Sequence, residues 1–125
     1  MRKPTRKGLV RKLDKAFSEY IRKRDKYCVV CGTRENLTCG HLFSRIAYST
    51  RWDEGNAFGQ CAGCNLRHEH DAYPFTKWFI SKFSQDHWDD LHHKYSTIRK
   101  FTNQELEALR IHFETKTEML IQEDK

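Results

Sequence analysis

The chain has 125 residues, the size of one domain with a modest hydrophobic core. Its 23 Lys and Arg exceed its 17 Asp and Glu and give a net charge of +6, which favours a polyanionic partner. No segment reaches the roughly 18 apolar residues of a membrane span, and no apolar run or cleavage site follows the basic start. We therefore expect neither a membrane protein nor a secreted one.

The first twelve residues form a basic arm that contains no acidic residue. We expect this arm to contact phosphates and release their counterions, although a disordered solubilising tail fits the charge equally well. Residues 13–125 follow as a single domain. The basic residues of the arm are Arg2, Lys3, Arg6, Lys7, Arg11 and Lys12.

Helical periodicity after the arm predicts a helix that ends near Asp25. Its apolar positions are Leu13, Ala16, Phe17, Tyr20 and Ile21. A short strand over residues 36–39 then leads to His41. After a long loop at residues 44–57, the segment 57–60 is expected to return as the partner strand.

Two CxxC pairs give the most specific pattern in the sequence. Cys28 and Cys31 form the first pair, and Cys61 and Cys64 form the second. Each short loop presents two thiolates, and two such loops complete a tetrahedral zinc site. Four cysteine ligands leave no open position for a substrate, so we expect a structural Zn²⁺. Cysteines used in this way suit a reducing compartment, which predicts a cytoplasmic protein, and Cys39 is expected to be a buried bystander.

The second half of the chain is expected to be helical. One helix begins inside the second CxxC pair, and another opens at Pro74 and carries apolar residues over 75–91. Thr102 and Glu105 form a capping box that starts the last helix. The predicted fold class is therefore α+β, with a small zinc-stapled centre flanked by N- and C-terminal helices.

Several motifs occur in a fixed order and resemble those of one family. They are Cys-x-x-Cys-Gly, Gly-His, Arg-Trp-Asp-Glu-Gly-Asn and Gln-Cys-x-x-Cys-Asn. The chain resembles the phage lambda NinG (Rap) recombination endonucleases, within the HNH nucleases. The resemblance implies a ββα-metal core and cleavage of branched DNA, such as Holliday junctions, flaps or forks, with Mg²⁺ or Mn²⁺ as the catalytic cation. It also implies a bacterial or phage-infected cell as the setting.

Three polar residues are candidates for the catalytic chemistry. His41 suits the general base that deprotonates water, because imidazole titrates near neutral pH, and a core histidine is the alternative. Asn56 could orient His41 through a hydrogen bond across the hairpin, or it could be an ordinary turn residue. The amide oxygen of Asn65 could bind a divalent cation, and the resemblance makes Asn65 the third motif position.

One position departs from the family pattern. The motif usually has an acidic metal ligand immediately before the base histidine, and Gly40 stands there. The missing ligand would have to come from elsewhere. We favour His70 and Asp71, which lie one or two helical turns after Asn65. The other candidates are Asp53, Glu54 and His68.

Four basic residues around the motif are expected to contact DNA phosphates: Arg45, Arg51, Arg67 and Lys77. Arg51 could instead pair with Glu54. Expected partners are branched DNA and recombination proteins, and a homodimer stays open as the oligomeric state. Two alternative interpretations are a zinc-ribbon module that binds DNA without cutting it, and an HNH nuclease without a preference for junctions.

Overall fold

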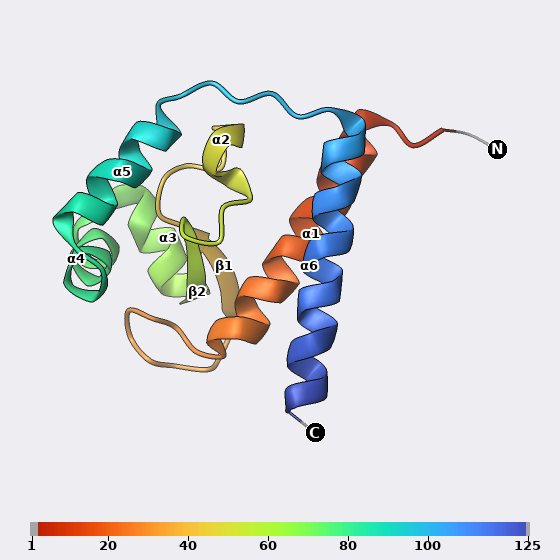
Figure 1. Ribbon diagram of the computed structural model, residues 1–125. Coiled ribbons are helices and arrows are strands. Elements are labelled where there is room, and N and C mark those ends of the chain that lie inside the picture. The colour runs from red at the N-terminus through yellow and green to blue at the C-terminus, as the bar shows by residue number, and fades with distance from the viewer. Residues whose placement is uncertain (1–2, 125) are drawn as a thin grey trace.

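The computed structural model describes residues 3–124, which form six helices and one two-stranded sheet (Figure 1). This mixed architecture confirms the predicted α+β class. None of the described helices is both long and apolar enough to cross a membrane. The elements in chain order are α1 (Arg6–Asp25), β1 (Leu37–His41), α2 (Tyr48–Arg51), β2 (Ala57–Cys61), α3 (Ala62–His70), α4 (Tyr73–Lys82), α5 (Gln85–Tyr95) and α6 (Asn103–Glu123).

Helix α1 begins earlier than the apolar periodicity predicts. The Thr5 hydroxyl accepts a hydrogen bond from the Gly8 N–H and caps the helix, which therefore starts at Arg6. Leu9 extends the buried stripe by one turn. The expected boundary at residue 13 thus falls inside α1, and most of the basic arm is helical. Arg2, also assigned to the arm, lies outside the described residues.

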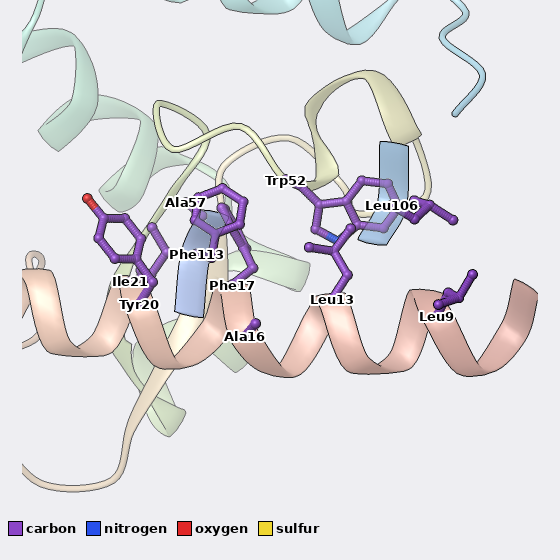
Figure 2. Packing of buried hydrophobic residues seen from close by; sticks show 10 residues of the cluster. All are labelled: Leu9, Leu13, Ala16, Phe17, Tyr20, Ile21, Trp52, Ala57, Leu106 and Phe113. Carbon is purple, nitrogen blue, oxygen red and sulfur yellow. The ribbon is translucent and has the colours of Figure 1, made fainter. Parts of the chain in front are cut away.

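Helices α1 and α6 lie side by side and run in the same direction (Figure 1). Arg6 donates to the Phe101 carbonyl near the start of both helices, and Lys23 pairs with Asp124 near their ends. Figure 2 shows how the buried side chains of α1 point toward α6 and the central hairpin. That core contains Leu9, Leu13, Ala16, Phe17, Tyr20, Ile21, Trp52, Ala57, Leu106 and Phe113. The predicted capping box of Thr102 and Glu105 is present at the start of α6.

The two predicted strands form an antiparallel hairpin. Leu37 pairs with Cys61 at one end and His41 pairs with Ala57 at the other. The register therefore separates the second CxxC pair from His41 by the full length of the hairpin. Helix α3 follows β2 directly and packs against both strands. The connection between the strands is only partly irregular, because residues 48–51 form the short helix α2.

The helix expected to open at Pro74 is divided into α4 and α5. The break falls at Ser84, whose hydroxyl accepts a hydrogen bond from the His87 N–H. A serine at this position satisfies the free N–H groups at the start of a new helix, which offsets the loss of continuous helical hydrogen bonds. The turn lets Phe79 of α4 and Leu91 of α5 share a second core cluster with Phe58.

Candidate functional site

The four paired cysteines gather at one end of the hairpin. All four Sγ atoms lie within 4.8 Å of one another, and no other group of three or more His, Cys, Asp or Glu side chains among the described residues has such spacing. The Sγ atoms of Cys31 and Cys61 are 3.7 Å apart. Two thiolates on a tetrahedral Zn²⁺ with bonds of about 2.3 Å would be about 3.8 Å apart. These residues therefore fit a structural zinc ion.

Main-chain N–H groups donate to two of the sulfurs in this cluster. The Cys31 N–H donates to Cys28 Sγ over 3.5 Å, and the Cys64 N–H donates to Cys61 Sγ over 3.4 Å. Burial opposes ionisation of Cys28, but main-chain donors that include the Cys31 N–H lower its pKa to about 7. Burial and the neighbouring cysteine sulfurs raise the pKa of Cys64. Burial also raises the pKa of Cys39, to about 12, but Cys39 is not a member of the metal cluster. Cys39 is therefore not a fifth ligand of the cluster, and it is part-buried.

His41 lies at the opposite end of the hairpin, beside a cavity of about 520 Å³. Its Nε2–H donates to the Arg51 carbonyl over 2.8 Å, which leaves Nδ1 as the unprotonated nitrogen of the neutral ring. Burial lowers the pKa of His41, while the bond to the Arg51 carbonyl acts in the opposite direction. The cavity is lined by Cys39, His41, Leu42, Ser44, Arg45, Asn65, His68 and Glu69.

Asn56 orders the loop that surrounds His41 and has no direct bond to the imidazole. Its side chain is fully buried and bonds to the Phe43 N–H, the Phe43 carbonyl and the Thr50 carbonyl over 2.8, 3.0 and 3.1 Å. Because Thr50 precedes Arg51, Asn56 fixes the main chain whose carbonyl holds His41. The expected direct hydrogen bond is corrected to this indirect one.

Helix α3 brings two oxygen-bearing side chains to the cavity. Asn65 donates through Nδ2 to the Thr38 hydroxyl over 3.0 Å, so its Oδ1 is the atom left for a ligand. Glu69 lies one helical turn later and lines the same cavity. Glu69 is not among the residues that the sequence predicts for this site, although its four-residue spacing from Asn65 places both on one helix face. His70 and Asp71 do not line this cavity.

The structure gives a physical reason for Gly40. A Cβ atom built there would lie 1.9 Å from Oε1 of Gln60, on the paired strand, and 2.7 Å from its Cδ. Gln60 is fully buried, so it cannot swing into solvent to make room. An acidic residue at position 40 is incompatible with this packing. The carboxylate that does line the cavity comes from another element, at Glu69 of α3.

His68 fastens α3 to the end of the hairpin. Its Nε2–H donates to the Leu42 carbonyl over 2.8 Å, and its ring meets Phe75 edge to face. One nitrogen of this ring is committed to the main chain, and its Nδ1 is buried. His68 therefore positions α3 against the strand that carries His41.

Arg51 has a structural role that corrects its assignment to DNA. Its side chain is only 13% exposed and makes two hydrogen bonds to Asp14 of α1, over 3.0 and 2.5 Å. Asp14 also accepts from Trp52 Nε1 over 2.9 Å. The alternative pairing of Arg51 with Glu54 is likewise wrong, because Glu54 pairs with Lys116 of α6. These contacts attach α2 to α1 and so hold the carbonyl that orients His41.

The remaining basic candidates differ in how they face the cavity. Arg45 lines the cavity, and its side chain is 61% exposed. Its guanidinium lies 3.4 Å from the Asp14 carboxylate. Arg67 is exposed on α3 and lies 3.5 Å from Asp71. Lys77 lies on α4 over the Tyr73 ring. Arg45 is therefore the one of these three basic residues that lines the cavity with His41.

The family model for Bacteriophage Lambda NinG protein matches residues 2–123. The chain belongs to the NinG family. It is 26% identical over 112 residues to Protein ninG of Escherichia phage lambda and to Protein ninG of Escherichia phage 933W. These alignments cover 86% of this chain but only 54% and 55% of the two relatives, so the chain spans about half their length. No solved structure matches this NinG chain.

Proposed function

We propose that this NinG chain is a metal-dependent DNA endonuclease of the HNH type that cuts branched recombination intermediates. One observation carries the proposal. A part-buried histidine at the end of a two-stranded hairpin has one ring nitrogen fixed by a main-chain carbonyl, and it shares a cavity with Asn65 and Glu69 of the helix that follows. Base, oxygen ligands and a phosphate-binding cation are thus available at one place.

His41 is the general base in this proposal. The bond from Nε2 to the Arg51 carbonyl selects the tautomer in which Nδ1 carries a lone pair. That nitrogen takes the proton from a water molecule as the water attacks the scissile phosphate. Burial lowers the pKa of His41, which keeps the ring neutral and able to accept a proton at pH 7.

The Asn65 amide oxygen and the Glu69 carboxylate would hold Mg²⁺ or Mn²⁺, which prefer oxygen donors. When bound, the cation supplies charge stabilisation for the phosphate and for the departing 3′ oxygen. Arg45 binds a neighbouring phosphate and sets the register of the backbone. Hydrolysis with this arrangement leaves 5′-phosphate and 3′-hydroxyl ends.

A preference for branched DNA follows from how the groups around the cavity would bind. Phosphate contacts position a protein without reading base sequence, so selection depends on DNA shape and deformability. Branched or unpaired backbones at junctions, flaps and forks bend into the cavity more easily than duplex does. We therefore expect branched substrates to be cut faster than linear duplex, with little dependence on sequence.

Two measurements test the proposal. Supercoiled plasmid incubated with the protein and Mg²⁺ or Mn²⁺ should be nicked by the wild type and by His70→Ala, but not by His41→Ala. A panel of labelled junctions, flaps, forks and duplexes then ranks the substrates at matched salt. DNA binding without any cutting would favour a zinc-ribbon binding module, and equal cutting of junction and duplex would leave only a general nuclease.

A further inference from the structure

Ile46 is an unusual side chain for its position. It exposes 85% of its surface, and among the large apolar residues of the described chain only Ile98, at 88%, is exposed to this degree. Single exposed apolar residues are common on protein surfaces. Ile46 differs from an ordinary one in two respects: how its loop is held, and what lies beside it.

The loop that carries Ile46 is held in place by hydrogen bonds. Asn56 bonds to both the N–H and the carbonyl of Phe43, at the start of the loop. The Ile46 N–H itself donates to the Ser44 hydroxyl over 3.2 Å. The main chain therefore fixes the direction in which Ile46 projects, and little conformational entropy remains to be lost when it contacts a ligand.

The neighbours of Ile46 belong to the candidate site. Ser44 and Arg45 immediately precede it and line the cavity that contains His41. A DNA backbone held by Arg45 at this cavity would bring its bases next to an apolar side chain that has no protein partner to cover it. Apolar side chains in such positions insert between base pairs, unstack them and kink the duplex.

We propose that Ile46 is a wedge that enters the base stack beside the scissile phosphate and thereby selects branched DNA. This inference rests on the proposed function and names the side chain through which the protein would select branched DNA. Separating stacked, paired bases costs free energy, and the cost is smallest where bases are already unpaired or unstacked. A wedge therefore discriminates in favour of branch points without reading sequence.

Ile98 does not fit this role. It lies on the segment between α5 and α6, and its neighbour Arg99 is engaged by Glu105 over 2.6 Å and by the face of Phe101. That arginine is therefore not free to hold a phosphate beside Ile98. Ile98→Ala thus serves as one comparison variant. Ile111→Ala is a second, because Ile111 is a half-exposed isoleucine on α6.

The first experiment measures unstacking directly. A four-way junction carrying 2-aminopurine at the branch point is titrated with protein without added divalent cation, so that no cleavage is needed. The wild type, Ile98→Ala and Ile111→Ala should raise the fluorescence several-fold, and Ile46→Ala should not. Equal fluorescence with Ile46→Ala and the wild type, or no rise with the wild type, would overturn the wedge.

The second experiment measures cleavage of two junctions that differ only at the branch point. Ile46→Ala should cut a fully paired junction about tenfold more slowly than the wild type, in line with the cost of unstacking a base step. It should cut a junction with two unpaired nucleotides at the branch at nearly the wild-type rate. An equal loss on both junctions would contradict the wedge. Fluorescence that depends on Ile46 without any cleavage would instead refute the nuclease proposal and support the wedge.

Discussion

The two ends of the central hairpin are built in opposite ways. At the Leu37–Cys61 end, four thiolates face one point, and a metal ion can replace the hydrophobic core that two short loops cannot form. At the His41–Ala57 end, main-chain hydrogen bonds position the polar groups around an open cavity. One pair of strands thus carries a candidate structural metal site at one end and a candidate reactive site at the other, and α3 runs from the first end to the second.

Substitutions in the cysteine cluster are expected to have the largest effect, a loss of folding stability. Structural Zn²⁺ in small domains contributes on the order of 10 kcal/mol, comparable with the whole stability of a domain. Cys31→Ser or Cys64→Ser should therefore unfold the hairpin and α3, and elemental analysis should find about one zinc per wild-type chain. Cys39→Ala is the matched control, since Cys39 is not in the cluster. A protein that stays folded after complete chelation would contradict the structural role.

A substitution of His41, at the other end of the hairpin, should leave the fold intact. His41→Ala should lower cleavage by about 10²- to 10⁴-fold, the usual contribution of a general base. Zinc content, melting temperature and DNA affinity should stay close to those of the wild type. His70→Ala, which changes a histidine outside the cavity, should keep full activity. An active His41→Ala protein would place the base elsewhere.

The pH dependence of cleavage tests whether His41 is the general base. Burial lowers the pKa of His41, so the imidazole stays neutral to a lower pH than an ordinary histidine does. Cleavage should be constant at neutral pH and fall as the pH drops through a value below about 6.5, the ordinary imidazole pKa. A profile that already declines above pH 7 on acidification would require a different base.

Glu69 tests whether the cavity holds the catalytic cation. Glu69→Gln removes the carboxylate charge with little change in size, and cleavage at limiting Mg²⁺ should fall at least about tenfold. Higher Mg²⁺ should restore part of the activity. Asp71→Asn is the matched control on the same stretch of chain. Loss of activity in Asp71→Asn but not in Glu69→Gln would indicate that His70 and Asp71 bind the cation instead.

The smallest effect should come from the surface charge at each end. Arg45→Ala removes one phosphate contact, so DNA binding should weaken for all sequences alike. The slope of log K against log salt should decrease by about one. Arg34→Ala removes an exposed arginine near the cysteine end and should leave the slope unchanged. Equal slopes for both variants would mean that Arg45 does not face DNA.

The sequence predicted features that depend on local spacing. The CxxC pairs, the strand before His41 and the Thr102–Glu105 capping box each involve residues a few positions apart, and the structure confirms all three. Contacts between distant residues were not predictable in this way. Its position beside motif residues predicts a DNA contact for Arg51, but its partner Asp14 lies 37 positions away on α1. Only the packing of α2 on α1 brings the two together.

Helical phase explains the other differences at the site. His70 and Asp71 follow Asn65 by one or two helical turns but do not share its helix face, and Glu69, which does share it, is not among the sequence-based candidates. A strict four-residue period would have selected Glu69. The break between α4 and α5 is harder to predict, because the apolar pattern continues through it and Ser84 is a weak local cue.

The hydrogen bond from His41 to the Arg51 carbonyl has a consequence for mutagenesis. The acceptor is a peptide oxygen, so no replacement of the Arg51 side chain removes it. A substitution at Arg51 would therefore test only the guanidinium, which bonds to Asp14, and not the carbonyl that holds His41. Semisynthesis offers the missing tool. An ester in place of the Arg51–Trp52 amide would leave every side chain unchanged and weaken that oxygen as an acceptor, and it would also remove the Trp52 N–H that bonds to the Thr50 carbonyl. The orientation of His41 is in this sense encoded in the path of the backbone, which the Asn56 and Arg51 side chains hold in place but whose acceptor oxygen they do not supply.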